Sequence, residues 1–380
     1  MKRFFALSLL SIFFIPTAKS QIVEPVRPIT TAVPFLLIPG DARSAGLGDQ
    51  GVATPVDAYS QFWNPAKYAF SENKQGFGFG YTPYLRELAD DINLGVLTYY
   101  NRINERSAFS GGLRYFGLGE VLLRQTADQQ PNTVEPNELA LDFSYSLRLD
   151  EQFSMAVTGR YIRSDLRIPD GIGSAEAANT FAADIAAYYQ GKEKFYETFS
   201  GRWRAGAMIS NIGPKISYDD GGSDNFIPTN FKIGGGFDFI FDQANKIGVY
   251  LEANKLLVPT PPENPEDFQS YYNQSEFGAI FSSWTDAPGG FSEEFKEITW
   301  SLGAEYWYED SFALRLGYFY EAPEKGFRQF ATLGFGFKYS QVMIDASYLF
   351  STAQGVQNPL EGTLRFSLSF LLGEKSYVEF

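Results

Sequence analysis

"LALDFSYSLRL", residues 139–149, alternates between apolar and mostly polar side chains at every position. One face would carry Leu139, Leu141, Phe143, Tyr145, Leu147 and Leu149, and the other Ala140, Asp142, Ser144, Ser146 and Arg148. A period of two residues predicts a β-strand. "VMIDASYLF" (342–350) and "LRFSLSFL" (364–371) repeat the pattern, so alternation is a property of much of the chain.

These segments are longer than the strands of most soluble sheets. They run for ~9–13 residues, against about 5–6 in globular proteins, and a tilted strand of that length crosses a bilayer. The face opposite the large apolar residues carries charges, at Asp142, Arg148, Arg160, Asp184, Arg315, Lys338, Asp345 and Arg365. A sandwich core could not bury so many charges without partners, whereas a barrel lumen can hold them. We therefore predict an all-β fold, a transmembrane antiparallel β-barrel.

The number and spacing of the segments agree with this architecture. We identify about 14 strands, and bacterial barrels of one chain have even numbers. Expected strand starts lie near residues 76, 92, 107, 137, 152, 178, 201, 229, 245, 297, 311, 327, 341 and 361. Short and long connections alternate, except at 191–200, which predicts short turns in the periplasm and long loops outside. We expect a monomer with both chain ends in the periplasm, and an aromatic girdle at Tyr99–Tyr100, Tyr188–Tyr189 and 306–308.

The chain begins with an export signal, and its composition removes most enzyme chemistry. Lys2 and Arg3 precede an apolar run, and small residues at Ala18 and Ser20 mark a cleavage site, so residues 1–20 are assigned as a signal peptide. The chain has no Cys and no His. No Ser-His-Asp triad, Cys–His pair or zinc cluster can therefore form. The formal net charge of −14 disfavours nucleic acid as a partner. We expect no enzymatic activity and no cofactor.

Residues 21–72 do not alternate, and they contain "GLGDQG" at 46–51. Gly46, Gly48 and Gly51 have the spacing of a dinucleotide-binding loop, but that loop needs a strand directly before it and a helix directly after it. Pro55 and Pro65 interrupt the following segment, which argues against a helix. We predict instead that 21–72 folds back into the lumen as a plug, ahead of a barrel formed by 73–380. The three glycines would allow tight packing there.

The same region resembles a known family. "ARSAGLGDQGVA" (42–53) followed by "DAYSQFWNPA" (57–66) resembles the N-terminal hatch of the FadL fatty-acid transporter family, with its Asn-Pro-Ala at Asn64, Pro65 and Ala66. The longer string 30–70, together with "SNIGPKISY" (210–218), is more similar still to the PorV (LptO) family, the FadL-like outer-membrane proteins of the type IX secretion system of Bacteroidetes. The similarity covers about residues 29–371. We expect Trp63 and Asn64 to be buried, with the Asn64 amide bonded to turn backbone.

This resemblance implies a cargo shuttle in the outer membrane of a Gram-negative bacterium, surrounded by outer-membrane lipid. Its partners would be the translocon barrel (SprA/Sov-like), cargo proteins held by their C-terminal signal domain, and a surface sortase (PorU-like). The alternative is a FadL-type channel for fatty acids or other hydrophobic compounds. A channel should have a continuous apolar cavity from the mouth toward the third strand, whereas a docking barrel should have a blocked lumen and an apolar loop surface. A third and more distant alternative is an enzyme of the barrel-lipase type, which would need a general base other than His because the chain has none.

The connection 255–296 is the longest expected outside loop and is rich in aromatic residues. They are Phe268, Tyr271, Tyr272, Phe277, Phe281, Trp284 and Phe291. Loops of this length are usually functional or disordered, and aromatic residues anchor protein interfaces. We interpret this loop as a site for partner or cargo binding; a cap over the barrel mouth is the other interpretation.

Two further motifs leave alternatives open. "YDDGGSDNF" (218–226) clusters Asp219, Asp220 and Asp224, which could bind calcium or form a solvated acidic turn. "GGLRYFGLG" (111–119) places four glycines in and just after the third strand. They predict either a plain bulge or, by resemblance to FadL relatives, a kink that opens a lateral gate.

Overall fold

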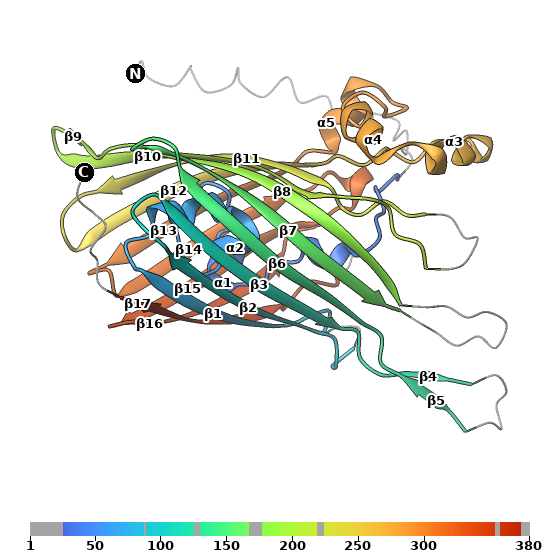
Figure 1. Cartoon of the computed structure of the whole chain (residues 1–380), viewed down its shortest axis with the longest axis horizontal. Helices are drawn as coiled ribbons and strands as arrows, with labels where there is room; N and C mark the ends of the chain where they lie inside the picture. The colour runs from blue at the N-terminus through green and yellow to red at the C-terminus, as the bar shows by residue number, and fades with distance from the viewer. Residues whose placement is uncertain are drawn as a thin grey trace, which may run out of the picture.

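The computed structural model describes residues 26–86, 89–124, 130–166, 177–218, 224–353 and 358–373, so the signal peptide assigned to 1–20 lies outside the described residues. A β-sheet closes on itself into an antiparallel barrel, because β10 pairs with both β8 and β11 and β1 pairs with both β17 and β2 (Figure 1). Fourteen strands form the wall in the described part of the chain, which confirms the predicted fold class.

The wall strands begin close to the predicted positions. They are β1 (Gln75–Pro83), β2 (Asn93–Arg102), β3 (Ser107–Gly117), β6 (Asn137–Arg148), β7 (Phe153–Asp165), β8 (Ala178–Gln190), β10 (Phe199–Ile212), β11 (Asn230–Ile240), β12 (Asn245–Leu256), β13 (Thr299–Tyr308), β14 (Phe312–Tyr320), β15 (Gln329–Tyr339), β16 (Val342–Ser351) and β17 (Leu364–Leu372).

Three short strands lie outside this pattern. β4 (Val121–Leu123) and β5 (Asn132–Val134) pair with each other and form a hairpin between β3 and β6. β9 (Lys194–Tyr196) pairs with the start of β10. That pairing explains the one connection that broke the alternation of loop lengths, since 191–198 is partly an extension of the wall.

The helices fall into two groups. Before β1 come η1 (Pro34–Leu37), α1 (Ala42–Gly46), α2 (Ser60–Trp63) and η2 (Pro65–Phe70). Between β12 and β13 come η3 (Pro265–Asp267), α3 (Phe268–Asn273), α4 (Glu276–Ser282) and α5 (Phe291–Lys296), and η4 (Pro323–Lys325) follows β14. Among the described residues, no helix combines the length and apolarity needed to span a bilayer.

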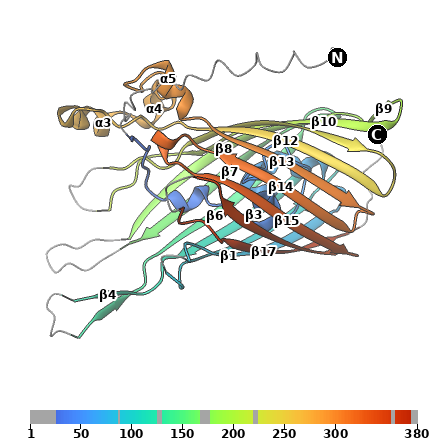
Figure 2. The same ribbon diagram turned by 180° about the vertical axis from the view of Figure 1, so that it is seen from behind.

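The long connections and the short turns lie at opposite ends of the barrel. Figures 1 and 2 show α3 to α5 and the β4–β5 hairpin at one end, and β9 with the short turns at the other. The chain leaves β17 at the short-turn end, where Leu372 pairs with Gln75. At the long-connection end, the Arg27 amide donates to the Glu324 carbonyl at 2.8 Å. The described chain therefore begins and ends at opposite ends of the barrel, whereas the chain ends that were expected to share one side lie outside the described residues.

The alternation sorts side chains between the lumen and the outer face. Phe143, Phe181 and Leu316 point outward and are exposed, whereas most of the charged residues predicted to face inward are buried. Those buried are Asp142, Arg160, Asp184, Arg315, Asp345 and Arg365; Arg148 and Lys338, close to the short turns, are only partly buried. Arg160 pairs with Asp142 at 2.6 Å and Asp184 at 3.0 Å, so these charges satisfy one another.

The same alternation shows that only part of the predicted aromatic girdle faces outward. Tyr100 and Tyr188 are buried on the inner face, and Tyr100 stacks on Tyr68 of the N-terminal segment at 4.5 Å between ring centroids. Two consecutive strand residues point to opposite sides of the sheet. A Tyr–Tyr pair can therefore supply only one ring to the lipid interface.

The third strand is regular. β3 pairs with β2 from Asn93↔Gly117 to Arg102↔Ala108, and with β6 along its full length, without a register shift. Neither the bulge nor the kink predicted from its glycines is present in this strand. A register shift occurs instead in β10 between Ile209 and Ile212, where Asn211 has a φ of 60°.

Candidate functional site

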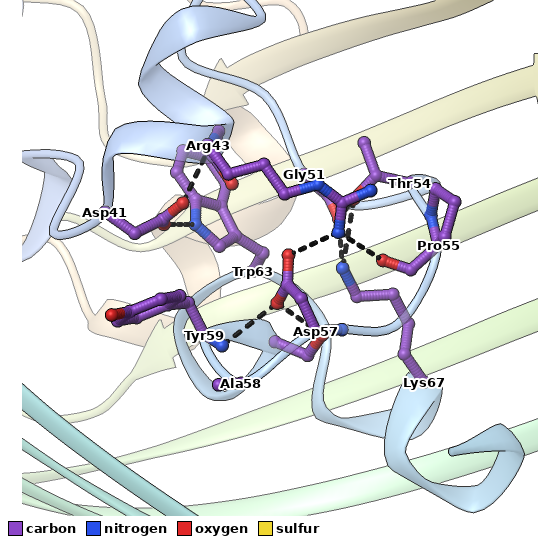
Figure 3. A network of polar contacts seen from close by, with 12 residues as sticks. Asp41, Arg43, Gly51, Thr54, Pro55, Asp57, Ala58, Tyr59, Trp63 and Lys67 are labelled. Carbon is purple, nitrogen blue, oxygen red and sulfur yellow. Dashed lines mark hydrogen bonds and ion pairs between the residues drawn. The ribbon is translucent and has the colours of Figure 1, made fainter. Parts of the chain in front are cut away.

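The N-terminal segment forms a compact plug inside the barrel, as predicted. Its helices contact β6, β7, β14, β15 and β16, and most of its described residues are buried. The Asp41 carboxylate begins α1 by accepting a hydrogen bond from the Ser44 amide at 2.8 Å. Its other oxygen accepts the Trp63 indole N–H at 2.6 Å, which ties α1 to α2 (Figure 3).

Asn64 joins the plug to the barrel wall. Its Nδ2 donates to the Val52 carbonyl and to the Ala187 carbonyl of β8, both at 2.9 Å, and its Oδ1 accepts the Ala66 amide at 3.1 Å. Pro65 starts η2, where its missing N–H costs nothing. The predictions that Trp63 and Asn64 are buried and that the Asn64 amide binds backbone are confirmed.

The glycines of "GLGDQG" stand where backbone meets backbone or an aromatic ring. Gly48 has a φ of +82°, and a Cβ there would lie 2.8 Å from the Tyr318 carbonyl oxygen. On the wall, a Cβ at Gly317 would lie 2.1 Å from the Gly48 nitrogen. A Cβ at Gly51 would meet the Trp63 ring at 2.5 Å, and Gly46 faces Gly334 of β15. At Gly46, Gly48 and Gly317 the backbones of plug and wall therefore meet without side chains between them.

Charged residues connect the plug to the wall. Arg43 binds Glu305 of β13 at 2.9 Å and Asp57 at 2.8 Å, and Glu305 also binds Arg315 at 2.7 Å. Lys67 donates from Nζ to the Gly51 carbonyl at 2.8 Å and to the Thr54 hydroxyl at 3.1 Å (Figure 3). The sequence did not predict contacts for Arg43, Glu305 or Lys67, although inward charges such as Arg315 indicated that opposite charges must face them.

Burial shifts the ionisation of two of these plug residues. Desolvation, and next the Asp57 carboxylate, raise the pKa of Asp41 to about 6. Desolvation lowers the pKa of the Lys67 ammonium to about 8.

A partly open cavity of about 450 Å³ lies between the plug and the long-connection end. Its wall comes from the N-terminal segment (residues 28–39, Asp49 and Trp63), from β11 to β15 and β17, and from Tyr84 beyond β1. No residue of β2, β3, β6, β7 or β8 lines it. This cavity therefore does not run toward the third strand.

The connection between β12 and β13 is folded rather than open, and we call residues 257–298 the cap. Its helices were not predicted from the sequence. Phe268, Tyr271 and Tyr272 contact one another, and Tyr271 packs on Phe226 at 5.9 Å between centroids. Trp284 packs on Phe231 of β11. These aromatic residues hold the cap together and seat it on the barrel rim.

Other aromatic residues of the cap have no such role. Phe277, Phe281 and Phe291 are 71%, 77% and 85% exposed. Phe277 and Phe281 are four residues apart on α4, and therefore share one face of the helix. The predicted binding residues thus divide into a group that packs on other rings, of which Trp284 is still 43% exposed, and a group that does not.

Ion pairs fix the cap to the barrel. Lys255 of β12 binds Glu294 at 3.1 Å and Glu297 at 2.6 Å, and Lys325 binds Glu297 at 2.9 Å. Arg27 reaches Glu263 at 2.7 Å. Elsewhere in the cap, partial burial raises the pKa of Asp286 to about 6, although a hydrogen bond from the Thr260 hydroxyl acts to lower it.

Only one of the three acidic residues of the possible calcium site lies within the described part of the chain. Asp219 and Asp220 lie outside the described residues, and Asp224 is exposed. Among the described residues, no group of three or more acidic side chains is arranged to hold a metal ion.

Comparison with known families decides the assignment. A family model described as "Type IX secretion system protein PorV" matches residues 21–263, which include the whole plug and the wall from β1 to β12. The chain belongs to the PorV family. No curated protein matches it.

Solved structures support the fold of this PorV-family chain. A TodX deltaS2S3 mutant monoaromatic hydrocarbon channel has 12% sequence identity and a TM-score of 0.51, over 87% of this chain and 98% of that one. The Pseudomonas putida toluene transporter TodX has 10% identity and a TM-score of 0.50, over 88% and 98%. At such identities only the fold is shared. PorV membership and this fold place the chain in the outer membrane.

Proposed function

We propose that this protein is a non-enzymatic component of type IX secretion that binds cargo by its C-terminal signal domain at the translocon and passes it to the surface sortase complex. The exposed part of the cap is the surface that contacts cargo or partner. The cap and the other long connections face the cell surface in this proposal.

The filled lumen carries the proposal. A channel needs a path through the plug, but Arg43, Asn64 and Glu305 bond the plug to the wall, and backbone contacts such as Gly48–Gly317 leave no room between them. The cavity at the long-connection end does not reach β3, and β3 has no kink. Neither this cavity nor β3 therefore has the feature expected of a FadL-type channel.

The exposed cap aromatics support the proposed contact between the cap and cargo or a partner. Large exposed side chains on a folded, ion-paired element lose little conformational freedom on binding, because the element is already ordered. Phe277, Phe281 and Phe291 have this setting. Aromatic residues of this kind dominate the energetics of many protein interfaces.

A triple variant tests the role of the cap. Phe277→Ser, Phe281→Ser and Phe291→Ser together should leave barrel assembly unchanged, because these rings are exposed. Loss of a hot-spot cluster costs about 2 kcal/mol or more, roughly 30-fold in affinity. Surface attachment of signal-bearing proteins, measured on intact cells, should fall accordingly. Phe195→Ser is the matched control, since Phe195 is 75% exposed at the short-turn end.

Two outcomes would contradict the proposal. Normal secretion by the triple variant would show that the exposed rings are not the contact surface. Poor growth on fatty acids with normal secretion would favour the FadL-type channel.

A further inference from the structure

A second hollow lies on the outer face of the barrel wall, across β13, β14, β15 and β16; the first three lie side by side in Figure 2. It has a volume of about 500 Å³, which is within the range of small-molecule sites. Every side chain that lines it is aromatic or aliphatic, and the hydroxyls of Tyr306 and Tyr308 are its only polar side-chain groups. It shares no lining residue with the cavity at the long-connection end, so it is a separate site.

The strand register explains the shape of this hollow. One row of outward side chains crosses the four strands through Tyr306, Leu314, Phe335 and Ala346. The next row, closer to the short turns, consists of Tyr308, Phe312, Phe337 and Ile344. Two rows on one face are two residues apart, about 6.8 Å along a strand, so a groove runs between them. Ala313 and Gly336 lie between the rows and point into the barrel, so their backbone forms the floor of the groove.

The groove is widest at β16, where Ala346 is the smallest residue of its row. Its neighbours across the strands are the rings of Phe335 and Phe366. The adjacent Asp345 is buried in the lumen, where it binds Arg315 at 2.7 Å, so Ala346 points outward. The methyl group of Ala346 therefore leaves space that a larger side chain would fill.

The groove faces lipid, close to the edge of the membrane. PorV membership and the fold place the wall in the outer membrane, and Phe335 and Ile344 are 55% and 52% exposed on its outer face. Tyr308 ends β13 and Phe312 begins β14, so the groove adjoins a short turn. Aromatic residues at strand ends mark the boundary between acyl chains and headgroups. The lipid beside the groove therefore presents the ester end of its acyl chains.

The two tyrosine hydroxyls of the groove differ in what they bind. The Tyr306 hydroxyl donates to Asn245 Oδ1 at 2.6 Å. The Tyr308 hydroxyl makes no hydrogen bond to any residue that the structure describes, and Tyr308 is 44% exposed. One donor is thus available at the edge of an otherwise apolar groove, at the depth where lipid offers an ester carbonyl as an acceptor.

We propose that this groove binds a glycerophospholipid, with one acyl chain between the two rows and the Tyr308 hydroxyl donating to an ester carbonyl. Water does not fill an apolar hollow, because it needs polar partners there. Dispersion contacts with the rings hold the chain, since the membrane is as apolar as the groove and adds no hydrophobic driving force. The choice of phospholipid over lipopolysaccharide rests on the proposed function, in which the short turns face the periplasmic leaflet.

Photolabelling of the purified full chain in detergent micelles tests the site. The probe is a phosphatidylethanolamine with a diazirine in one acyl chain, added in a substoichiometric amount, and peptide mass spectrometry locates the adducts. We expect most adducts within β13 to β16. Excess unlabelled phosphatidylethanolamine should remove them.

Ala346→Phe tests the groove itself, because a ring there occupies its widest part. Loss of about ten carbon–carbon contacts corresponds to roughly fivefold to thirtyfold in affinity, so labelling should fall by at least about fivefold. Ala207→Phe on β10 is the matched control, because Gly206 faces the plug and Ala207 therefore points outward, outside the groove. This control should be labelled like the unmodified protein. Tyr308→Phe should weaken labelling by about twofold to tenfold, the effect of one hydrogen bond.

Three outcomes would overturn the proposal. Adducts spread evenly over all wall strands of the unmodified protein would show that the groove holds no lipid, and this result does not depend on how a variant folds. Labelling unchanged by Ala346→Phe would place the lipid elsewhere. Displacement of the probe by lipopolysaccharide more readily than by phospholipid would show that the lipid class is wrong. Secretion does not enter these measurements, so a failure of the proposed role in secretion is a separate result.

Discussion

At the scale of single residues, Asn64 shows how a short motif is explained by its contacts. Its side chain satisfies two carbonyls and one amide that belong to three separate segments: Val52, Ala187 and Ala66. Asn64→Ala leaves these groups unpaired, at about 1–3 kcal/mol for each buried one. The barrel should then unfold at lower temperature on semi-native gels. Asn273→Ala, at an exposed position of α3, should change nothing. Unchanged heat resistance with failed secretion would make Asn64 a contact residue instead.

Lys67 gives a pH dependence whose sign follows from its burial. Desolvation lowers its folded pKa to about 8, below the ordinary value of about 10.4. Between these values the unfolded chain binds more protons than the folded one, so this group's contribution to stability rises with pH. Lys67→Met should flatten the rise in unfolding temperature between about pH 8 and pH 10 relative to the unmodified protein. A variant with an unchanged pH profile would show that Lys67 is not desolvated.

At the scale of elements, the wall was predictable and the helices were not. A two-residue period is visible in the sequence because each strand has one face toward lipid, and β6 shows it for its whole length. The cap helices α4 and α5 are only seven and six residues long. Helices this short depend on tertiary contacts such as Lys255–Glu294. The glycines of β3 predicted a bulge or kink that this strand does not have, because strand glycines also occur where plug and wall approach closely, as Gly112 does beside Phe62.

The fit between plug and wall can be tested on one strand. In β14, Gly317→Ala would place a methyl group 2.1 Å from the Gly48 nitrogen, which requires the plug to move. Overpacking of this kind costs about 1–3 kcal/mol, so the unfolding temperature in detergent should fall. Gly95→Ala on β2 is the control, since a Cβ there has nothing within 4 Å. Equal unfolding temperatures for the two variants would show that the plug does not rest on this wall.

At the scale of the whole molecule, the sequence predicted the class of protein better than its site. Motifs near Asn64 identified the plug, but the cavity residues Lys232 and Arg365 come from strands more than a hundred residues apart. Only closure of the barrel brings them together. The split of the cap aromatics into packed and exposed groups also depends on neighbours, such as Phe226 and Phe231, that belong to other connections.

Topology is the prediction that involves the entire chain. The protein has no Cys, so each introduced one is a unique label. A Cys at Gly289 in the cap should react with an impermeant reagent on intact cells, and a Cys at Asp310, in a short turn, should not. Val26 is exposed next to Arg27, which is bonded to Glu324 at the long-connection end. A Cys at Val26 should therefore be labelled together with Gly289, although it belongs to the segment 21–72 that was predicted to lie in the lumen. Labelling of the Cys at Asp310 alone would mean that the barrel has the opposite orientation in the membrane. Labelling of Gly289 without Val26 would mean that the residues around Val26 do not lie at the mouth of the barrel in cells, and that Arg27 does not anchor them to the cap.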